Sequence, residues 1–194
     1  MTGMRHLEEL RQALSRLERD LDRIDMWGEA IADVLDGGGR LLAAGNGGSA
    51  AQAQHLTAEL VGRYLTERRP LSAIALHADT SALTAIVNDY GAAEGFARSV
   101  RAHGRKGDVL VALSTSGRSV NVLEAVAEAR SLGISTLALT GAGPNPLTNA
   151  ADDAVCVDAS TPTVQEVHQV AIHLLCEAID ARIAEGAVVG AGRA

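Results

Sequence analysis

The sequence predicts a doubly wound α/β fold with a parallel sheet, preceded by a helical N-terminal region. Five short apolar runs alternate with amphipathic segments from residue 40 onward. The runs are almost continuously apolar, as expected for strands that are covered on both faces. Two of them end in loops rich in glycine or hydroxyl residues that lead into helices, which is typical of α/β folds.

The first 36 residues form the helical region. Apolar residues recur there at alternating spacings of three and four, at Leu7, Leu10, Leu14, Leu17, Leu21 and Ile24, and Ile31 and Leu35 extend the same phase. Such a seam either packs on the chain's own domain or forms helix–helix contacts between subunits. Three glycines at 37–39 then end the helix.

The strands and helices of the core follow in order. We expect the strands at 40–44, 72–76, 108–113, 135–139 and 154–157. We expect helices near 49–63, 80–87, 92–104, 119–132 and 144–150, and a final helix near 162–184. The 194 residues are expected to form a single domain, with an α/β core over 37–184 and a small flexible tail over 185–194.

Composition and charge exclude several classes of partner. The net charge of −7 gives no general support to binding a phosphate backbone, and four aromatic residues are too few for a base-stacking platform. Apolar runs are too short to span a membrane, and the charged first residues do not resemble a signal peptide. The two cysteines cannot build a disulfide scaffold. We therefore expect a cytoplasmic protein that binds neither nucleic acid nor membrane.

Two loops indicate a ligand site at the carboxyl edge of the sheet. Residues 45–49 (GNGGS) follow the first strand, and residues 114–119 (STSGRS) follow the third. If the strand order is 2-1-3-4-5, these strands are neighbours and both loops face one crevice.

The chemistry of the loops suits a phosphate. Glycine lets backbone N–H groups approach an anion, and a helix N-terminus carries partial positive charge. A tight turn with Ser49 as N-cap is an alternative explanation of the first loop, whereas four hydroxyls in residues 114–119 exceed what one cap needs. Neither loop has the spacing of a Walker motif or a dinucleotide fingerprint, so a different phosphate ligand is expected.

Two helices carry side chains suited to metal binding and proton transfer. His55 and Glu59 are four residues apart and share one face of the helix after the first loop. The last helix contains Gln165, Glu166, His168, Gln169 and His173. A surface hydrogen bond for the first pair and a core histidine at His173 are the alternatives. Together these residues offer ligands for Zn²⁺ and an acid/base pair, if the two helices meet.

Five segments, GNGGSAAQAQHLTAEL, VNDY, ALSTSGRSVNVLEA, LTG and TPTVQEVHQVAIHLL, occur in this order along the chain. With them the sequence resembles, from about residue 5 to residue 183, the phosphoheptose isomerase family of the sugar-isomerase (SIS) domain superfamily. The resemblance implies a flavodoxin-like five-stranded sheet and a homotetramer with active sites between subunits. It also implies that sedoheptulose 7-phosphate is converted to D-glycero-D-manno-heptose 7-phosphate through an enediol, assisted by one Zn²⁺ per subunit.

The resemblance also assigns roles to residues. The metal ligands would be His55, Glu59, Gln165 and His173, with Glu59 as the base and His173 as the acid/base at the oxygens. The phosphate would be bound by Ser114, Thr115, Ser116 and Ser119. The remaining substrate contacts would come from Asn46, Gly47, Gly48, Ser49, Asn88, Asp89 and Gln165. One departure is Gln52, where family members commonly carry Asp.

Two other functions remain open. A sister SIS family binds the bacterial replication initiator as a tetramer without catalysis, although Glu59 and His173 favour an enzyme. Isomerisation of a pentose or hexose phosphate on the same fold is the second alternative.

Overall fold

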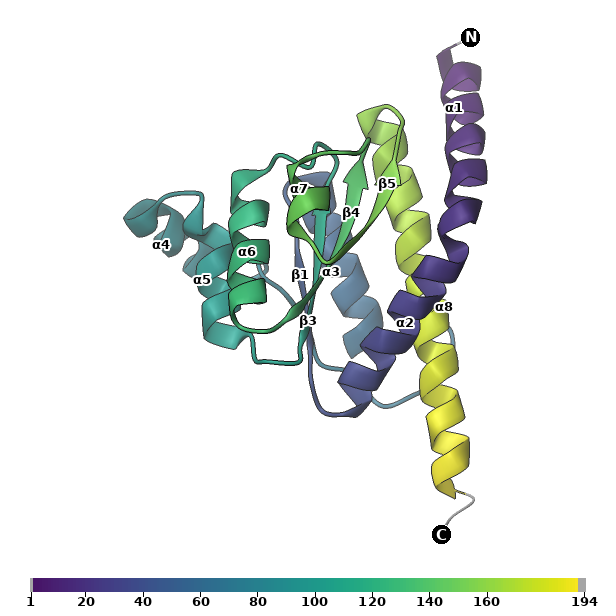
Figure 1. Cartoon of the computed structure of the whole chain (residues 1–194), viewed down its shortest axis with the longest axis vertical. Coiled ribbons are helices and arrows are strands. Elements are labelled where there is room, and N and C mark those ends of the chain that lie inside the picture. Colours follow the sequence, from purple (N-terminus) through teal and green to yellow (C-terminus); the bar gives the residue numbers. More distant parts are fainter. Residues whose placement is uncertain (1, 192–194) are drawn as a thin grey trace.

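The computed structural model describes residues 2–191, with side chains described for residues 3–186. Five strands form one parallel sheet in the order β2-β1-β3-β4-β5 (Figure 1). They are β1 (Leu41–Ala44), β2 (Ala73–Ala75), β3 (Val109–Ser114), β4 (Ser135–Gly141) and β5 (Asp153–Val157). The predicted fold class and strand order are confirmed. Every residue of β1 and β3 is buried, which explains why these strands are apolar throughout.

Helices cover both faces of the sheet, and each face has its own apolar core. One side carries α1 (Thr2–Leu17), α2 (Leu21–Asp36), α3 (Gly48–Val61) and α8 (Thr161–Ala191). The other carries α5 (Glu94–His103), α6 (Val120–Ser131) and α7 (Pro146–Ala150). In contrast, α4 (Thr80–Tyr90) has no buried residue and projects from the margin of the molecule in Figure 1.

The N-terminal region consists of two helices, whereas the apolar spacing predicted one continuous helix. A 3-10 turn (Glu18–Asp20) separates α1 from α2, and Figure 1 shows α2 inclined to α1. Leu17 and Ile24, on either side of the turn, are both buried. The bend therefore keeps the regularly spaced apolar residues of both helices packed against the domain. Leu7 and Leu21 stay exposed, so the seam packs only partly within the chain. As predicted, α2 ends where the three glycines begin.

The last helix is longer than predicted. We expected it to end near residue 184, but α8 continues to Ala191. The added segment contains no proline, and its glycines weaken a helix without ending it. The predicted end of the helix is therefore wrong, and residues 192–194 of the expected tail lie outside the described residues.

Two close contacts set the position of α8. Gly28 of α2 lies against it, and a Cβ at this glycine would collide with α8. Arg68 donates from Nε to Asp180 over 2.7 Å, and the two side chains are only 7% and 12% exposed. The same guanidinium donates to the carbonyls of Glu59 (2.8 Å) and Leu60 (2.9 Å) near the end of α3. Arg68 therefore fixes α3 against α8.

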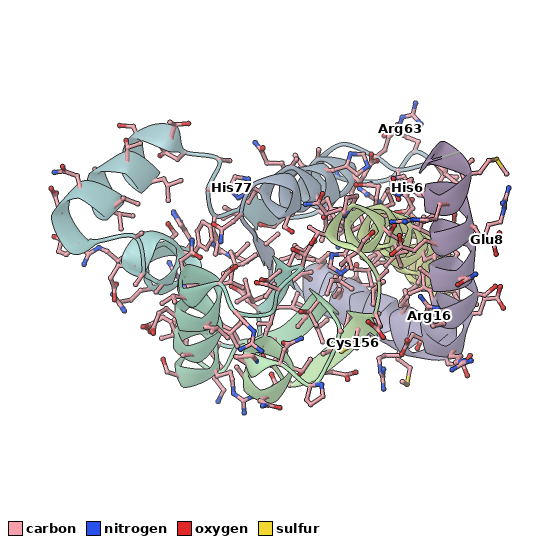
Figure 2. All side chains as sticks on the ribbon, turned by 90° about the horizontal axis from the view of Figure 1, so that it is seen from above. His6, Glu8, Arg16, Arg63, His77 and Cys156 are labelled. Atoms are coloured by element: carbon pink, nitrogen blue, oxygen red, sulfur yellow. The ribbon has the colours of Figure 1, made fainter. Side chains whose placement is uncertain are left out.

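Helix α1 is tied to the start of α8. His6 Nε2 lies 2.8 Å from Glu166 Oε1, and Figure 2 shows the His6 side chain on the α8 side of α1. About one turn further along α1, the Glu9 carboxylate accepts from the backbone N–H of Ser160 (2.7 Å) and from its hydroxyl (3.0 Å). These bonds satisfy N-terminal donors of α8 and fix where this helix begins.

Within the described residues, none of the helices has the length and apolar character that crossing a membrane requires.

Candidate active site

The first glycine loop turns β1 into α3. Gly47 has a φ of +55°, which favours glycine, and it stands at the N-cap without a side-chain cap. Ser49 is already inside the helix and 3% exposed, so the alternative that it serves as N-cap is wrong. A Cβ at Gly48 would collide with the Gln165 amide, so this glycine lets α8 approach the loop. Asn46, in the same loop, is exposed.

The hydroxyl loop turns β3 into α6. Ser114 Oγ lies 3.1 Å from Ser119 Oγ and 3.5 Å from Ser116 Oγ. Ser119 stands at the N-cap of α6, but its side chain makes no capping hydrogen bond. Thr115 is half-buried beside them. Helix capping therefore does not explain this group of hydroxyls, which lies at the positive end of a 12-residue helix.

The two loops lie side by side at the carboxyl edge of the sheet, as the predicted strand order requires. Asn46 of the first loop donates to Asn121 over 2.8 Å and accepts from it over 2.9 Å. Asn121 lies in the first turn of α6, so this amide pair joins the starts of α3 and α6. We did not predict Asn121 as a site residue from the sequence. Its position two residues after the hydroxyl loop could have indicated that it lies at the site.

The candidate catalytic side chains lie where α3 meets α8. His55 Nε2 is 2.9 Å from His173 Nε2 and 3.4 Å from Glu59 Oε1. The Gln169 amide is 3.1 Å from the same nitrogen of His173, and the Tyr64 ring packs on His173 at 5.5 Å between centroids. The spacing of these residues in the sequence could not show whether the two helices meet. In the structure they do. His173 is half-buried within this group and is not a core histidine.

Two imidazoles and a carboxylate are ligand types that Zn²⁺ accepts. The two histidine nitrogens, 2.9 Å apart, lie near the separation of about 3.4 Å between ligands of one tetrahedral zinc ion. Gln165 is instead placed against Gly48. Among the side chains that the structure describes, no three His, Cys, Asp or Glu residues form a group arranged to hold a metal ion. The donors fit zinc in type, and His55 and His173 also fit it in position.

Gln52 joins the two helices one turn before His55. Its Nε2 donates to the backbone carbonyl of Gln165 over 2.5 Å, and the residue is 7% exposed. A carboxylate has no proton to donate to this carbonyl. The amide at this position therefore secures the contact between α3 and α8 in this chain.

Two of the predicted substrate residues lie on α4, apart from the two loops. Asn88 and Asp89 are exposed there, and the Asn88 amide donates to the Asp89 carboxylate over 2.8 Å. Because α4 projects from the margin of the molecule, these side chains are not brought to the loops of their own chain (Figure 1).

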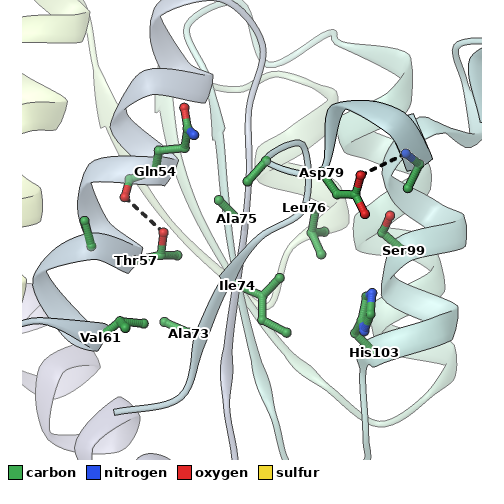
Figure 3. Close-up of a pocket in the computed structure, with 13 residues that line it drawn as sticks. Gln54, Thr57, Val61, Ala73, Ile74, Ala75, Leu76, Asp79, Ser99 and His103 are labelled. Carbon is green, nitrogen blue, oxygen red and sulfur yellow. Dashed lines mark hydrogen bonds between the residues drawn. The ribbon is translucent and has the colours of Figure 1, made fainter. Parts of the chain in front are cut away.

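A groove of 540 Å³ also lies apart from the candidate site. Figure 3 shows that it runs beside edge strand β2, between α3 and the helices α4 and α5. Gln54 and Thr57 of α3 line it, whereas His55 and Glu59 lie on the α8 side of the same helix. None of the predicted site residues lines the groove, so we do not assign the catalytic site to it despite its size.

The core histidine of α8 is His168, not His173. His168 is fully buried and its Nε2 lies 3.2 Å from the carbonyl of Thr140. Burial lowers the pKa of His168 to about 4, so it is neutral at physiological pH. Cys176 lies eight residues further along α8. Burial, as the larger cause, and the charge of Glu59, as the second, raise the pKa of this thiol to about 12. Cys176 therefore does not supply a thiolate nucleophile at neutral pH.

Fold and site together define a class: an α/β domain of the SIS type, with a glycine loop and a hydroxyl loop at the carboxyl edge of its sheet. A family model described as SIS domain matches residues 5–141. The chain is 61% identical over 182 residues to phosphoheptose isomerase of Streptomyces coelicolor, covering 93% of this chain and 79% of that protein. It is 47% identical over 180 residues to phosphoheptose isomerase of Helicobacter pylori, covering 92% of each.

Solved structures agree with these relatives. Phosphoheptose isomerase GmhA from Neisseria gonorrhoeae matches with a TM-score of 0.85 and 41% identity, covering 93% of this chain and 97% of that one. A phosphoheptose isomerase from Francisella tularensis matches with a TM-score of 0.87 and 36% identity over the same shares. The chain belongs to the phosphoheptose isomerase family of SIS-domain proteins, and it is an enzyme of the aldose–ketose isomerase type.

The buried His168 predicts acid sensitivity. Its pKa in the folded protein, about 4, is below the ordinary 6.5, so the unfolded chain takes up the proton first as pH falls. The contribution of neutral His168 to the free energy of unfolding is fully present above pH 6.5. It is lost as the pH falls toward 4, by up to about 3 kcal/mol. Urea unfolding at pH 7.5 and 5 should show a smaller pH effect in His168→Gln than in the wild type. Equal pH effects, or an NMR titration of His168 above pH 6, would contradict this account.

Proposed function

We propose that the enzyme converts sedoheptulose 7-phosphate to D-glycero-D-manno-heptose 7-phosphate through an enediol. The observation that carries this proposal is the pair of groups in one chain: a cluster of hydroxyls at the start of α6 and a Glu59–His55–His173 chain of contacts where α3 meets α8. Relatives named phosphoheptose isomerase support the seven-carbon substrate over shorter sugars.

The phosphate would be bound by Ser114, Thr115, Ser116 and Ser119 at the start of α6. Backbone N–H groups and the helix dipole favour the anion there, and the hydroxyls donate to its oxygens. Because the phosphate is remote from the reacting carbons, its binding energy orients the flexible chain toward Glu59 and His173. Asn46, which pairs with Asn121, and Gln165, which lies against Gly48, would bind the sugar hydroxyls.

Glu59 and His173 would share the proton transfers. The Glu59 carboxylate takes a proton from C1 while His173 gives a proton to the oxygen on C2, which forms the enediol. His173 then takes the proton from the oxygen on C1, and Glu59 returns its proton to C2. The proton count balances, because each residue ends in the state in which it began.

A divalent ion, with Zn²⁺ as the proposed occupant, would be held by His55 and His173, with Glu59 and Gln165 moving to complete the set. When bound, the ion polarises the sugar carbonyl as a Lewis acid. A group that binds metal must be deprotonated and is a weaker base, so Glu59 and His173 would each alternate between binding the ion and transferring a proton.

We further propose that the working unit is a homotetramer with active sites between subunits, acting on a small sugar phosphate in the cytoplasm. Asn88 and Asp89 lie on α4, which has no buried residue in its own chain. Val87 and Tyr90 of the same helix are 41% and 55% exposed. If a neighbouring subunit covers α4, both polar residues would lie beside the loops of that subunit, which they do not reach in their own chain.

Substitution of the proton-transfer residues tests the reaction. Glu59→Gln and His173→Gln should each lower kcat on sedoheptulose 7-phosphate by about 100-fold or more, because each removes a group that transfers protons. Matched controls are Glu124→Gln and His103→Gln, exposed residues of α6 and α5, which should keep full activity. A panel of five-, six- and seven-carbon ketose phosphates separates the substrate alternatives. A wild type that is inactive on all of them with divalent metal supplied would exclude the proposal.

Metal content tests the cofactor. Elemental analysis of the purified protein should find about one divalent ion per subunit, and a chelator should remove both the ion and the activity. His55→Gln should lower the metal content, because it removes one of two imidazole ligands, while His103→Gln leaves it unchanged. Full activity in rigorously metal-free protein would show that the ion has no catalytic role.

A further inference from the structure

A buried chain of hydrogen bonds connects α8 to the hydroxyl loop. Thr140 lies near the end of β4 and is fully buried. Its hydroxyl donates to the carbonyl of Ser114 over 2.8 Å, at the first residue of the loop. Its own carbonyl accepts from His168 Nε2 over 3.2 Å. One residue of the sheet is therefore bonded to the loop on one side and to α8 on the other.

Asn145 extends this chain beneath the loop. Its Nδ2 donates to the Thr140 hydroxyl over 3.2 Å and to the carbonyl of Ala142 over 3.1 Å. Its Oδ1 accepts from two backbone N–H groups at the start of α7. Gly117, at a φ of +61° in the middle of the loop, rests on this side chain, and a Cβ there would collide with it. The backbone N–H of Leu147 also donates to the Gly117 carbonyl over 3.0 Å.

The loop is thus supported at two points, Ser114 and Gly117. The hydroxyls of Ser116 and Ser119 lie 3.5 and 3.1 Å from Ser114 Oγ, so a shift of the Ser114 backbone would move Ser114 Oγ away from both of them. Burying this many polar groups is unfavourable unless each is paired, and a packed apolar contact would support a plain turn equally well. The hydrogen bonds instead specify one conformation of the loop.

We infer that Thr140, Asn145 and His168 are positioning residues that hold the hydroxyl loop in its phosphate-binding form and in register with α8. This inference rests on the proposed function, because the phosphate is the ligand that the loop would bind. None of the three side chains touches the substrate in this account. Their effect reaches the phosphate through the backbone of Ser114 and Gly117.

The chain offers a matched control on the same strand. Thr136 is also fully buried, and its hydroxyl also donates and accepts, to the Asp152 carboxylate (2.8 Å) and from the Asp152 N–H (3.0 Å). It lies four residues before Thr140, about 13 Å along the strand, and its hydroxyl bonds to Asp152 rather than to the loop. Replacing either threonine by valine removes one hydroxyl at nearly constant volume.

The test measures binding of inorganic phosphate by calorimetry, together with KM and kcat for the sugar phosphate. Thr140→Val should weaken phosphate binding and raise KM by about tenfold, with kcat changed less than about threefold, since the hydroxyl acts on the phosphate end only. Thr140→Ser, which keeps the hydroxyl, should restore wild-type binding. Thr136→Val should lower the free energy of unfolding as much as Thr140→Val but leave phosphate binding unchanged.

A second variant covers the case in which Thr140→Val does not fold. Asn145→Ser keeps an acceptor at the cap of α7 but loses both donors of the amide, and it should also weaken phosphate binding. Equal phosphate binding in wild type, Thr140→Val and Asn145→Ser would overturn the inference and leave the proposed function intact. Equal weakening by Thr136→Val would also overturn it, as would failure of Thr140→Ser to restore binding. A wild type that binds neither phosphate nor sugar phosphate would overturn the proposed function, and this inference with it.

Discussion

The packing of α8 against α3 is the interaction on which the candidate site depends. Neither helix carries a complete constellation, because His55 and Glu59 belong to one and His173 to the other. Their relative position is set away from the chemistry, by apolar packing along α8 and by the buried Arg68–Asp180 pair at the end of α3. Breaking one partner of such a pair leaves an uncompensated buried charge, so the pair enforces a single register of the two helices.

The sheet supplies the second half of the site. Because β1 and β3 are parallel neighbours, the loops that follow them lie at the same edge of the sheet, next to the starts of α3 and α6. The Asn46–Asn121 amide pair joins the two loops to each other. The hydroxyl loop is thus suited to bind an anion, and the junction of α3 with α8 is suited to move protons.

Much of this could be predicted from the sequence, because buried parallel strands are continuously apolar and the loops between them are chemically distinctive. The details that depend on tertiary packing could not. Spacing alone cannot show that the seam bends at residues 18–20, nor that α8 extends to Ala191. Likewise, apolar neighbours suggested His173 as the core histidine, whereas the fully buried one is His168. The residues around a side chain in sequence do not show which other element covers it.

The most direct test of the account is a crystal structure of the Glu59→Gln variant with sedoheptulose 7-phosphate bound. The account predicts the phosphate on the hydroxyls of residues 114–119, with C1 and C2 of the sugar beside residue 59 and His173. It also predicts that Asn88 and Asp89 of a neighbouring subunit lie near the sugar. A phosphate bound away from the hydroxyl loop, or reacting carbons away from the junction of α3 and α8, would contradict it.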